Sequence, residues 1–429
     1  MKKIIQHLDS GLHGEITIPS DKSLSHRAVM LASLAKGKSV IKNFSLGNDP
    51  HSSLRIFQAL GIEARFIDKS TLEINSSGNL LQPELPLDCG NSGTTMRLVS
   101  GILAGQNFNS ELTGDMSLSK RPMKRIIEPL ELMGAKISSV DNHAPLKIYG
   151  ENLTGINYVS KLASAQVKSC ILLAGLFAEG TTTYTEPYLS RNHTEIMLKY
   201  MGANIKNVNT STSIEKSVLM PQTIEICGDI SSAAYFIAAG LIIPNSDIIV
   251  KNSGLNPTRT GILEVVKKMG GDIQIFNERK LSGEAVGDIR ITSSELTGCT
   301  IDGNMIPRLI DELPVIAVMA TQAQGETVVK GAEDLRNKES DRIKSTVNEL
   351  KKLGANIEER ADGFIVQGKT RLKGDCIVDT YQDHRLAMCL YIAGLICEKS
   401  ITINGFEWIN ISFPEFEKYI SSLNLRKNQ

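Results

Sequence analysis

Five short pairs, each a Leu or Met followed by Gly, recur along this chain of 429 residues and constrain its fold more than any other feature. Each pair closes an amphipathic segment, at the position where a helix ends in a left-handed residue and Gly is favoured. Successive glycines are 73, 68, 68 and 84 residues apart. The pairs are Leu60-Gly61, Met133-Gly134, Met201-Gly202, Met269-Gly270 and Leu353-Gly354. A period of about 70 residues predicts repeated units, each of which needs its neighbours to complete a hydrophobic core.

Each unit also contains an earlier helix that begins with polar Gly, Asp or Ser residues. This first helix is apolar nearly all round, as in Ala28–Ala32 and Ala234–Ala239, which predicts burial. The second helix is amphipathic, as in Ile262–Met269, and the one in the last unit is expected over Phe413–Leu423, ending at Asn424. Short β-branched segments follow the helices. The pattern therefore predicts an α/β fold of six βαβαβ-like repeats, which divide naturally into two lobes of three.

Composition excludes several classes of protein. Hydrophobic residues make up 41% of the chain and charged residues 22%, as in a globular protein. The 47 Lys and Arg balance the 47 Asp and Glu, which gives no support for nucleic acid or an anionic membrane as a partner. No membrane span and no signal-peptide core are predicted. The seven Cys form no C-x-x-C pair, so we expect reduced thiols in a cytoplasmic protein, with no disulfide and no zinc site.

The chemistry is predicted at the starts of the apolar helices. One helix begins near Asp21 and carries Lys22, Ser23 and Arg27 on its first two turns. The unpaired N–H groups and positive dipole end of a helix start suit an anion, and the added cations favour a phosphate or carboxylate. A capped, solvated helix start is the simpler reading of this segment taken alone. Five further segments of similar design favour the binding interpretation.

The next two repeats offer similar groups. In Asn91-Ser-Gly-Thr94, Gly93 allows the backbone to approach a ligand, although the segment lacks the Gly-Lys-Ser/Thr of a P-loop and a tight turn also explains it. Arg121 precedes another helix, where a surface charge is the alternative. Ser164 and Gln166 stand at a third helix start, where small polar residues are usually caps.

The fifth and sixth repeats add carboxylates to the cations. Lys338 and Arg342 are four residues apart, so in a helix they would share one face and repel each other unless an anion lay between them. A solvated face with i,i+4 ion pairs is the alternative. Asp311 and Glu339 lie among the cations, where carboxylates serve as general acids or bases. Arg385 follows at the last apolar helix, and Arg suits bidentate recognition of phosphate or carboxylate.

Six cations thus fall at or near predicted helix starts in a chain of zero net charge: Lys22, Arg27, Arg121, Lys338, Arg342 and Arg385. Such a concentration predicts a multiply anionic ligand. No Ser-His-Asp order, metal cluster or dinucleotide fingerprint competes in the sequence. The residues alone therefore predict a two-lobed enzyme that acts on small phosphorylated anions by acid–base catalysis, with no metal and no cofactor.

Six segments, in order and over essentially the whole chain, resemble the 5-enolpyruvylshikimate-3-phosphate (EPSP) synthase family. They are Asp21-Lys-Ser-Leu-Ser-His-Arg27, Gly90-Asn-Ser-Gly-Thr94, Arg121-Pro-Met123, Ser164-Ala-Gln166, Lys338-Glu-Ser-Asp-Arg342 and Asp383-His-Arg385. The resemblance implies two lobes, each an inside-out α/β barrel of three repeats, with the active site in the cleft between them. It implies a first lobe over residues 20–227 and a second lobe formed by 1–19 together with 228–429. We expect a monomer.

The resemblance also implies a reaction. The enolpyruvyl group of phosphoenolpyruvate moves to the 5-hydroxyl of shikimate 3-phosphate and phosphate is released, in the pathway to chorismate and aromatic amino acids. C3 of the enol gains a proton while the hydroxyl loses one and attacks C2; the tetrahedral adduct then loses phosphate and a C3 proton. By resemblance, Asp311 is the base near the 5-hydroxyl, Glu339 protonates and deprotonates C3, and Lys22 touches both substrates and assists proton transfer.

The family motifs assign the substrate contacts. For shikimate 3-phosphate they imply Lys22, Ser23, Arg27, Ser164, Ala165, Gln166, Arg191, Asp311 and Lys338. For phosphoenolpyruvate they imply Lys22, Gly93, Arg121, Gln166, Arg342 and Arg385. Ala165 stands where some members have a second Ser, which removes one phosphate hydrogen bond. Asn410-Ile411 stands just before Ser-Phe-Pro, where many members have a Lys, so we expect a raised KM for phosphoenolpyruvate.

Indications on inhibition point in opposite directions. The herbicide glyphosate occupies the phosphoenolpyruvate site in this family, and Gly93 leaves room for it, whereas Ser164–Ser169 and Ser190–His193 resemble the branch that is often tolerant.

Two other functions compete. A related enolpyruvyl transferase acts on a UDP-amino sugar with a loop cysteine, but none of the seven Cys lies in an evident Gly- and Arg-rich loop. A catalytically dead anion-binding protein is the other, and the retained Asp311 and Glu339 argue against it.

Overall fold

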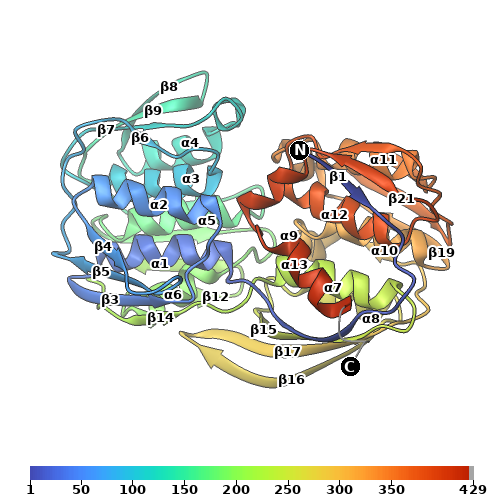
Figure 1. Cartoon of the computed structure of the whole chain (residues 1–429). Helices are drawn as coiled ribbons and strands as arrows, with labels where there is room; N and C mark the ends of the chain where they lie inside the picture. The colour runs from blue at the N-terminus through green and yellow to red at the C-terminus, as the bar shows by residue number, and fades with distance from the viewer. Residues whose placement is uncertain (425–429) are drawn as a thin grey trace. The chain divides into compact units, whose positions relative to one another are not determined.

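The computed structural model describes residues 1–424 and divides into two compact units, coloured along the chain in Figure 1. The first unit contains Ser20–Ile226 together with Lys280–Glu284. The second unit contains Met1–Pro19, Cys227–Arg279 and the described chain from Ala285 on. Neither unit is one continuous stretch of sequence. Among residues 1–424, no helix has the length and apolar character needed to cross a membrane.

The repeat has the order β-α-β-α-β-β, which the second repeat shows in full. It runs through β6 (Leu87–Asp88), α3 (Gly93–Ala104), β7 (Ser110–Thr113), α4 (Lys124–Leu132), β8 (Lys136–Val140) and β9 (His143–Tyr149). Its sheet has the order β6-β7-β9-β8, with β6 parallel to β7 and the other neighbours antiparallel. The α/β fold class is confirmed. The first five repeats each have one strand more than expected, because their last two strands form a hairpin that was read as a single strand in the sequence. The sheet of the sixth repeat has only β22 and β23 of its own and is completed by β1.

The first unit contains three such repeats. Its other helices are α1 (Lys22–Leu34), α2 (Asn48–Ala59), the 3-10 helix η1 (Leu118–Lys120), α5 (Ala165–Gly175) and α6 (His193–Tyr200). Its other strands are β3 (Gly37–Lys42), β4 (Glu63–Phe66), β5 (Leu72–Ser76), β10 (Asn157–Val159), β11 (Thr181–Thr185), β12 (Ile205–Val208), β13 (Ser211–Glu215) and β14 (Thr223–Glu225). The strands form the sheets β14-β3-β5-β4, β6-β7-β9-β8 and β10-β11-β13-β12.

The second unit holds the last three repeats. Its helices are α7 (Ile230–Ile242), α8 (Gly261–Lys268), η2 (Gly303–Met305), α9 (Ile306–Leu309), α10 (Leu313–Gln322), η3 (Glu333–Asn337), α11 (Arg342–Lys352), α12 (His384–Leu395), η4 (Phe406–Ile411) and α13 (Phe416–Asn424). Its strands are β1 (Lys2–Ile5), β2 (His13–Thr17), β15 (Asp247–Gly254), β16 (Asp272–Leu281), β17 (Glu284–Thr292), β18 (Thr300–Ile301), β19 (Gly325–Val329), β20 (Asn356–Arg360), β21 (Gly363–Gly368), β22 (Ile377–Asp379) and β23 (Ile401–Asn404). They form the sheets β16-β17-β15-β2, β18-β19-β21-β20 and β1-β23-β22.

The helix ends predicted from the Leu/Met-Gly pairs are confirmed. The outer helices α2, α4, α6, α8 and α11 end one residue before the Leu or Met, which is fully buried in each case. The following Gly has a positive φ between +77° and +100° in all five. The last outer helix differs, because α13 begins at Phe416 rather than Phe413. The residue before a proline avoids helical backbone, and Phe413 precedes Pro414.

The inner helices form the core of each unit, where they lie between the sheets (Figure 1). They are α1, α3 and α5 in the first unit and α7, α10 and α12 in the second, and nearly all of their residues are buried. Helices α3 and α5 approach so closely at Gly101 that a Cβ there would lie 2.1 Å from the carbonyl oxygen of Cys170. Side chains cap most of the inner helices: Asp21, Ser92, Ser164, Asp229 and Asp383 each accept a backbone N–H.

Two strands are exchanged between the units. Strand β2 precedes α1 in the sequence but pairs in parallel with β15 of the second unit, with Ile16 opposite Val250. Strand β14 precedes α7 but pairs in parallel with β3 of the first unit, with Ile224 opposite Ile41. The repeat pattern alone did not say which sheet the first strand joins.

Candidate active site

The starts of α3 and α5 in the first unit are joined by predicted site residues. Gln166 donates to Thr94 Oγ1 at 3.1 Å and accepts from Arg97 Nη1 at 2.6 Å. Arg121, which follows η1, donates to Asn91 Oδ1 at 2.9 Å. The structure thus brings the predicted Gln166 and Arg121 to one group of polar side chains. Arg97 is also a member; the sequence offered it one helical turn after Thr94, but the substrate assignments did not include it.

Gly93 is the first residue of α3 and faces the same group. A Cβ at this position would lie 3.0 Å from Arg97 Nη1 and 3.4 Å from Arg121 Nη1. A side chain here would therefore crowd the guanidinium group of Arg97 and touch that of Arg121, so the missing Cβ leaves room for both groups.

Arg27 is buried and fixed by three hydrogen bonds. Its Nε donates to Thr194 Oγ1 at 2.7 Å, its Nη2 to Ser169 Oγ at 2.9 Å and its Nη1 to the carbonyl of Ser23 at 2.9 Å. The bonds connect α1 with α5 and α6. Ser169 and Thr194 were not predicted, because small polar residues within helices carry no signal of a distant partner.

Lys22 and His26 extend this arrangement on α1. Lys22 Nζ lies 2.9 Å from Asp49 Oδ2, a carboxylate on α2 that the sequence did not single out. His26 Nδ1 lies 2.7 Å from Ser53 Oγ, which in turn lies 2.9 Å from Thr95 Oγ1 on α3. Burial, with the charges of Lys22 and Arg27, lowers the pKa of His26 well below its ordinary value. The imidazole is therefore neutral near pH 7 and fastens α1 to its neighbours.

The segment that carries Arg191 is held by a buried lysine. Lys168 Nζ lies 2.7 Å from Glu186 Oε1 and 2.8 Å from Glu195 Oε1, and it donates to the carbonyl of Ser190 at 3.1 Å. Lys168 is a member of α5 and is almost fully buried. A single Lys in a helix that is otherwise apolar all round was the sequence signal for this cluster.

The remaining predicted residues of the first unit stand at element ends. Ser164 caps α5 by accepting the N–H of Val167, and Ala165 is the first residue of that helix. Ser23 is the second residue of α1 and contributes its carbonyl to Arg27. Arg191 is half-buried between β11 and α6.

In the second unit, one buried guanidinium gathers three carboxylates. Arg342 is 2% exposed, and its Nε donates to Asp383 Oδ2 at 2.7 Å. Its Nη2 donates to Glu339 Oε2 at 2.6 Å and its Nη1 to Asp311 Oδ1 at 3.1 Å. Burial opposes the charge of Arg342, but Asp383, Glu339 and Asp311 outweigh it and raise the pKa of the guanidinium. The two carboxylates predicted to transfer protons are therefore held by the same cation.

The predicted stacking of Lys338 on Arg342 is wrong. Asp341 accepts the N–H of Lys344 and caps α11, so the helix begins at Arg342. Lys338 lies before that cap in extended backbone and is half-buried. The charge of Arg342 is offset by carboxylates instead, as described above.

Arg385 completes the cluster from the start of α12. Its Nη2 lies 3.4 Å from Asp311 Oδ2, and its backbone N–H donates to Asp383 Oδ1 at 2.9 Å. Burial would by itself raise the pKa of Asp383, but the charge of Arg342 outweighs it and lowers that pKa below the ordinary value. Asp383 is fully buried and is the member of this cluster that the motif contained but our site assignment omitted.

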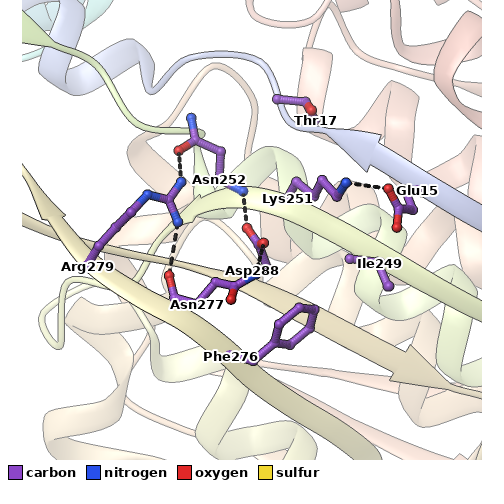
Figure 2. Close-up of a pocket in the computed structure, with 9 residues that line it drawn as sticks. All are labelled: Glu15, Thr17, Ile249, Lys251, Asn252, Phe276, Asn277, Arg279 and Asp288. Carbon is purple, nitrogen blue, oxygen red and sulfur yellow. Dashed lines mark hydrogen bonds and ion pairs between the residues drawn. The ribbon is translucent and has the colours of Figure 1, made fainter.

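A cavity of about 390 Å³ lies on the sheet β16-β17-β15-β2 of the second unit (Figure 2). It is lined by Glu15, Thr17, Ile249, Lys251, Asn252, Phe276, Asn277, Arg279 and Asp288. None of these is a predicted site residue. Lys251 pairs with Glu15, Arg279 donates to Asn252 Oδ1 at 2.7 Å, and Asn277 donates to Asp288 Oδ2 at 3.0 Å. The charged groups of this cavity thus have partners within it.

Comparison with known proteins identifies the family. The model of EPSP synthase (3-phosphoshikimate 1-carboxyvinyltransferase) matches residues 8–420. A 3-phosphoshikimate 1-carboxyvinyltransferase of Thermodesulfovibrio yellowstonii is 52% identical, over 99% of this chain and 100% of the relative. One of Bacillus licheniformis is 48% identical, over 96% of this chain and 98% of the relative.

Solved structures agree. The EPSP synthase of Acinetobacter baumannii has a TM-score of 0.88 at 39% identity and covers 99% of this chain, which in turn covers 98% of it. The enolpyruvyl transferase NikO of Streptomyces tendae has a TM-score of 0.81 at 17% identity, with 98% and 97% covered, and so shares the fold. This chain belongs to the EPSP synthase family.

Proposed function

We propose that this chain transfers the enolpyruvyl group of phosphoenolpyruvate to the 5-hydroxyl of shikimate 3-phosphate and releases phosphate, with Asp311, Glu339 and Lys22 as catalytic residues. Family membership supports the reaction, since the relatives named above are 3-phosphoshikimate 1-carboxyvinyltransferases. The observation that carries the residue roles is the pairing of Arg342 with both Asp311 and Glu339.

The roles follow from charge. Arg342 and Arg385 both lie within ion-pair distance of Asp311, and neighbouring cations favour the ionised form of a carboxylate. An ionised Asp311 accepts the proton of the 5-hydroxyl as its oxygen attacks C2. Glu339 acts in its protonated form once Arg342 no longer holds it: it delivers that proton to C3 as the adduct forms, and the carboxylate left behind removes a C3 proton when phosphate leaves. Lys22 offsets the negative charge of the phosphate groups.

Substrate binding draws on the predicted contacts of both units. Shikimate 3-phosphate contacts Lys22, Ser23, Arg27, Ser164, Ala165, Gln166, Arg191, Asp311 and Lys338. Phosphoenolpyruvate contacts Lys22, Gly93, Arg121, Gln166, Arg342 and Arg385. The anionic groups of phosphoenolpyruvate compete with Glu339 for the N–H groups of Arg342. When Arg342 turns to the substrate, Glu339 is released toward C3, so binding and proton transfer are linked.

The first experiment is phosphate release by the purified chain. Shikimate 3-phosphate and phosphoenolpyruvate are supplied together, each is supplied alone, and UDP-N-acetylglucosamine replaces the shikimate compound in a fourth reaction. Release only with the first mixture supports the proposal. Release with the UDP-sugar assigns the chain to a different acceptor, and no release from folded protein contradicts catalysis.

We also propose that the enzyme is a monomer in the cytoplasm. All seven cysteines are free thiols and five of them are buried, which suits a reducing compartment. Light scattering coupled to gel filtration measures the mass directly. One chain has a mass of 46.8 kDa, so a measured mass of about twice that value, near 94 kDa, contradicts the monomer.

A further inference from the structure

Two strained residues stand directly before the cluster in the second unit. Tyr381 has a φ of +50° and Gln382 a φ of +63°, and they immediately precede Asp383. Asn and Asp adopt this left-handed conformation most readily, as Asp141 and Asn142 do in the turn between β8 and β9, whereas Tyr and Gln adopt it rarely. Backbone strain of this kind gathers at functional sites. The question is what holds this turn.

Glu349 holds the turn from α11. The hydroxyl of Tyr381 donates to Glu349 Oε1 at 2.7 Å, and the N–H of Asp379 donates to Glu349 Oε2 at 3.0 Å. Asp379 in turn accepts the N–H of Tyr381 at 2.7 Å. The side chain of Glu349 is fully buried. The hydrogen bond to Glu349, with burial, raises the pKa of Tyr381 to about 12, so its hydroxyl remains a donor at neutral pH.

The same helix also holds the other end of the turn. Arg342 and Glu349 are seven residues apart on α11, two turns of helix, and so share one face. Arg342 binds Asp383 at 2.7 Å, while Glu349 binds Tyr381 and the backbone of Asp379. One helix face thus fixes both ends of the strained turn. Asp383 then caps α12 and orients the start of the helix that carries Arg385.

We propose that Glu349 and Tyr381 are positioning residues that keep Asp383, and through it Arg342 and Arg385, aligned for phosphoenolpyruvate. The inference rests on the proposed function. If the Tyr381 hydroxyl is lost, the turn relaxes toward ordinary backbone and moves Asp383 with it. Small displacements of binding groups cost much in rate or affinity, and the loss is confined to the substrate that uses those groups.

The test is Tyr381→Phe, which removes one hydroxyl and little volume. We expect the KM for phosphoenolpyruvate to rise roughly tenfold, the effect of losing one hydrogen bond to a charged group. The KM for shikimate 3-phosphate should stay within about twofold, because most of its predicted contacts lie on the first unit. Tyr419→Phe in α13 is the matched control, with the same atom removed in the same unit, and both KM values should remain at the wild-type level.

A second variant tests strain as the cause. We call the hydrogen bonds from Tyr381 and the backbone of Asp379 to Glu349 the clamp. Gly adopts positive φ without penalty, so Gln382→Gly should remove the need for the clamp. The KM of the Tyr381→Phe protein for phosphoenolpyruvate should then return to within about threefold of wild type. If the turn has a merely structural role, Tyr381→Phe and Gln382→Gly should each lower the melting temperature, and neither should alter the KM for phosphoenolpyruvate. An equal rise of both KM values, or a defect that Gln382→Gly deepens, also overturns the proposal.

Hydrogen exchange separates this inference from the function itself. The amides of Thr380–Arg385 should exchange faster in Tyr381→Phe than in wild type, whether or not the protein turns over. Unchanged exchange overturns the clamp. If the wild-type protein releases no phosphate in the phosphate-release assay described above, the proposed function is overturned instead. The exchange measurement then still decides whether Glu349 and Tyr381 hold the turn.

Discussion

The inner helices of the two units begin with similar polar sequences, but the predicted site arginines of the two units contact different kinds of oxygen. In the first unit Arg27 donates to two hydroxyls and a carbonyl, and Arg121 donates to the side-chain oxygen of Asn91. In the second unit Arg342 contacts three carboxylates and Arg385 contacts one of the same three. Neutral oxygens orient a guanidinium without offsetting its charge, whereas carboxylates offset it.

We expect the two units to contribute differently to the proposed reaction. An arginine oriented by hydroxyl and carbonyl oxygens suits the binding of a phosphate ester, and a guanidinium surrounded by carboxylates suits proton transfer. Lys22, paired with Asp49, and Lys168, paired with Glu186 and Glu195, are cations of the first unit that also contact carboxylates. Of these two, Lys22 is the one to which the family motif gives a part in the chemistry. The predictions below test this division, beginning with the largest effect.

Glu339→Gln should separate chemistry from binding most sharply. Removing a general acid–base group lowers kcat by about 10² to 10⁴. The affinity for phosphoenolpyruvate should be kept or increased, because the competing carboxylate on Arg342 is gone. Single-turnover kinetics measures the first effect, and equilibrium binding of phosphoenolpyruvate measures the second. Glu358→Gln, at an exposed ion pair with Arg360, is the control, and near wild-type kcat for Glu339→Gln would remove Glu339 from the mechanism.

Arg342→Met and Arg27→Met compare the two kinds of partner through stability. Loss of Arg342 leaves buried carboxylates without their cation, which costs about 3–5 kcal/mol of unfolding free energy. Loss of Arg27 leaves two hydroxyls and a carbonyl without this hydrogen-bond donor, which costs about 1–3 kcal/mol of unfolding free energy. Urea unfolding followed by circular dichroism and by the fluorescence of Trp408, the single Trp, measures both. Equal losses would contradict the distinction between the units.

Acid should weaken the second unit through Asp383. The pKa of Asp383 is lowered in the folded protein, so its contribution to stability is fully present above the ordinary Asp value of about 3.9 and is lost as the pH falls through the lower folded value. Trp408 lies in η4 of the second unit and reports its unfolding. Unfolding free energy measured between about pH 5 and pH 2 should fall with a smaller slope in Asp383→Asn than in wild type. Identical slopes would show that Asp383 does not govern this acid response.

Ala165→Ser should give the smallest change and affects only the first unit. If the hydroxyl restores the phosphate hydrogen bond that some relatives make, the KM for shikimate 3-phosphate falls about two- to fivefold, the effect of one hydrogen bond of modest strength. The KM for phosphoenolpyruvate stays the same. Ala163→Ser, two residues earlier and outside the helix, is the matched control. A rise in the KM for shikimate 3-phosphate would place residue 165 away from the phosphate.

Local patterns predicted the features that depend on neighbouring residues. The glycines that end the outer helices and the polar caps of most inner helices follow from backbone preferences and were confirmed. The stacking of Lys338 on Arg342 failed for the same kind of reason, since Asp341 starts the helix one residue before Arg342 and we had not read it as a cap. The hairpin at the end of each of the first five repeats was also missed, because its two strands were read as one.

Partners on other helices and loops could not be predicted. Asp49 for Lys22, Thr194 for Arg27 and Glu349 for Tyr381 lie 27, 167 and 32 residues away along the chain. Their pairing depends on which helix faces which, and spacing within one segment carries no information on that. The assignment of the predicted site residues themselves came from family motifs, and the experiments above test it.

The exchanged strand β2 has a consequence for how the chain is made. Its partner β15 is synthesised some 230 residues later, and at 5–20 residues per second a ribosome needs roughly 10–50 seconds to reach it. During that interval the three repeats of the first unit emerge, while β2 has no strand beside it in its final sheet. A nascent chain must therefore keep residues 13–17 from pairing with the wrong edge. The order of synthesis thus makes β2 the second strand to appear, although its place in the sheet is open until the first unit has been made.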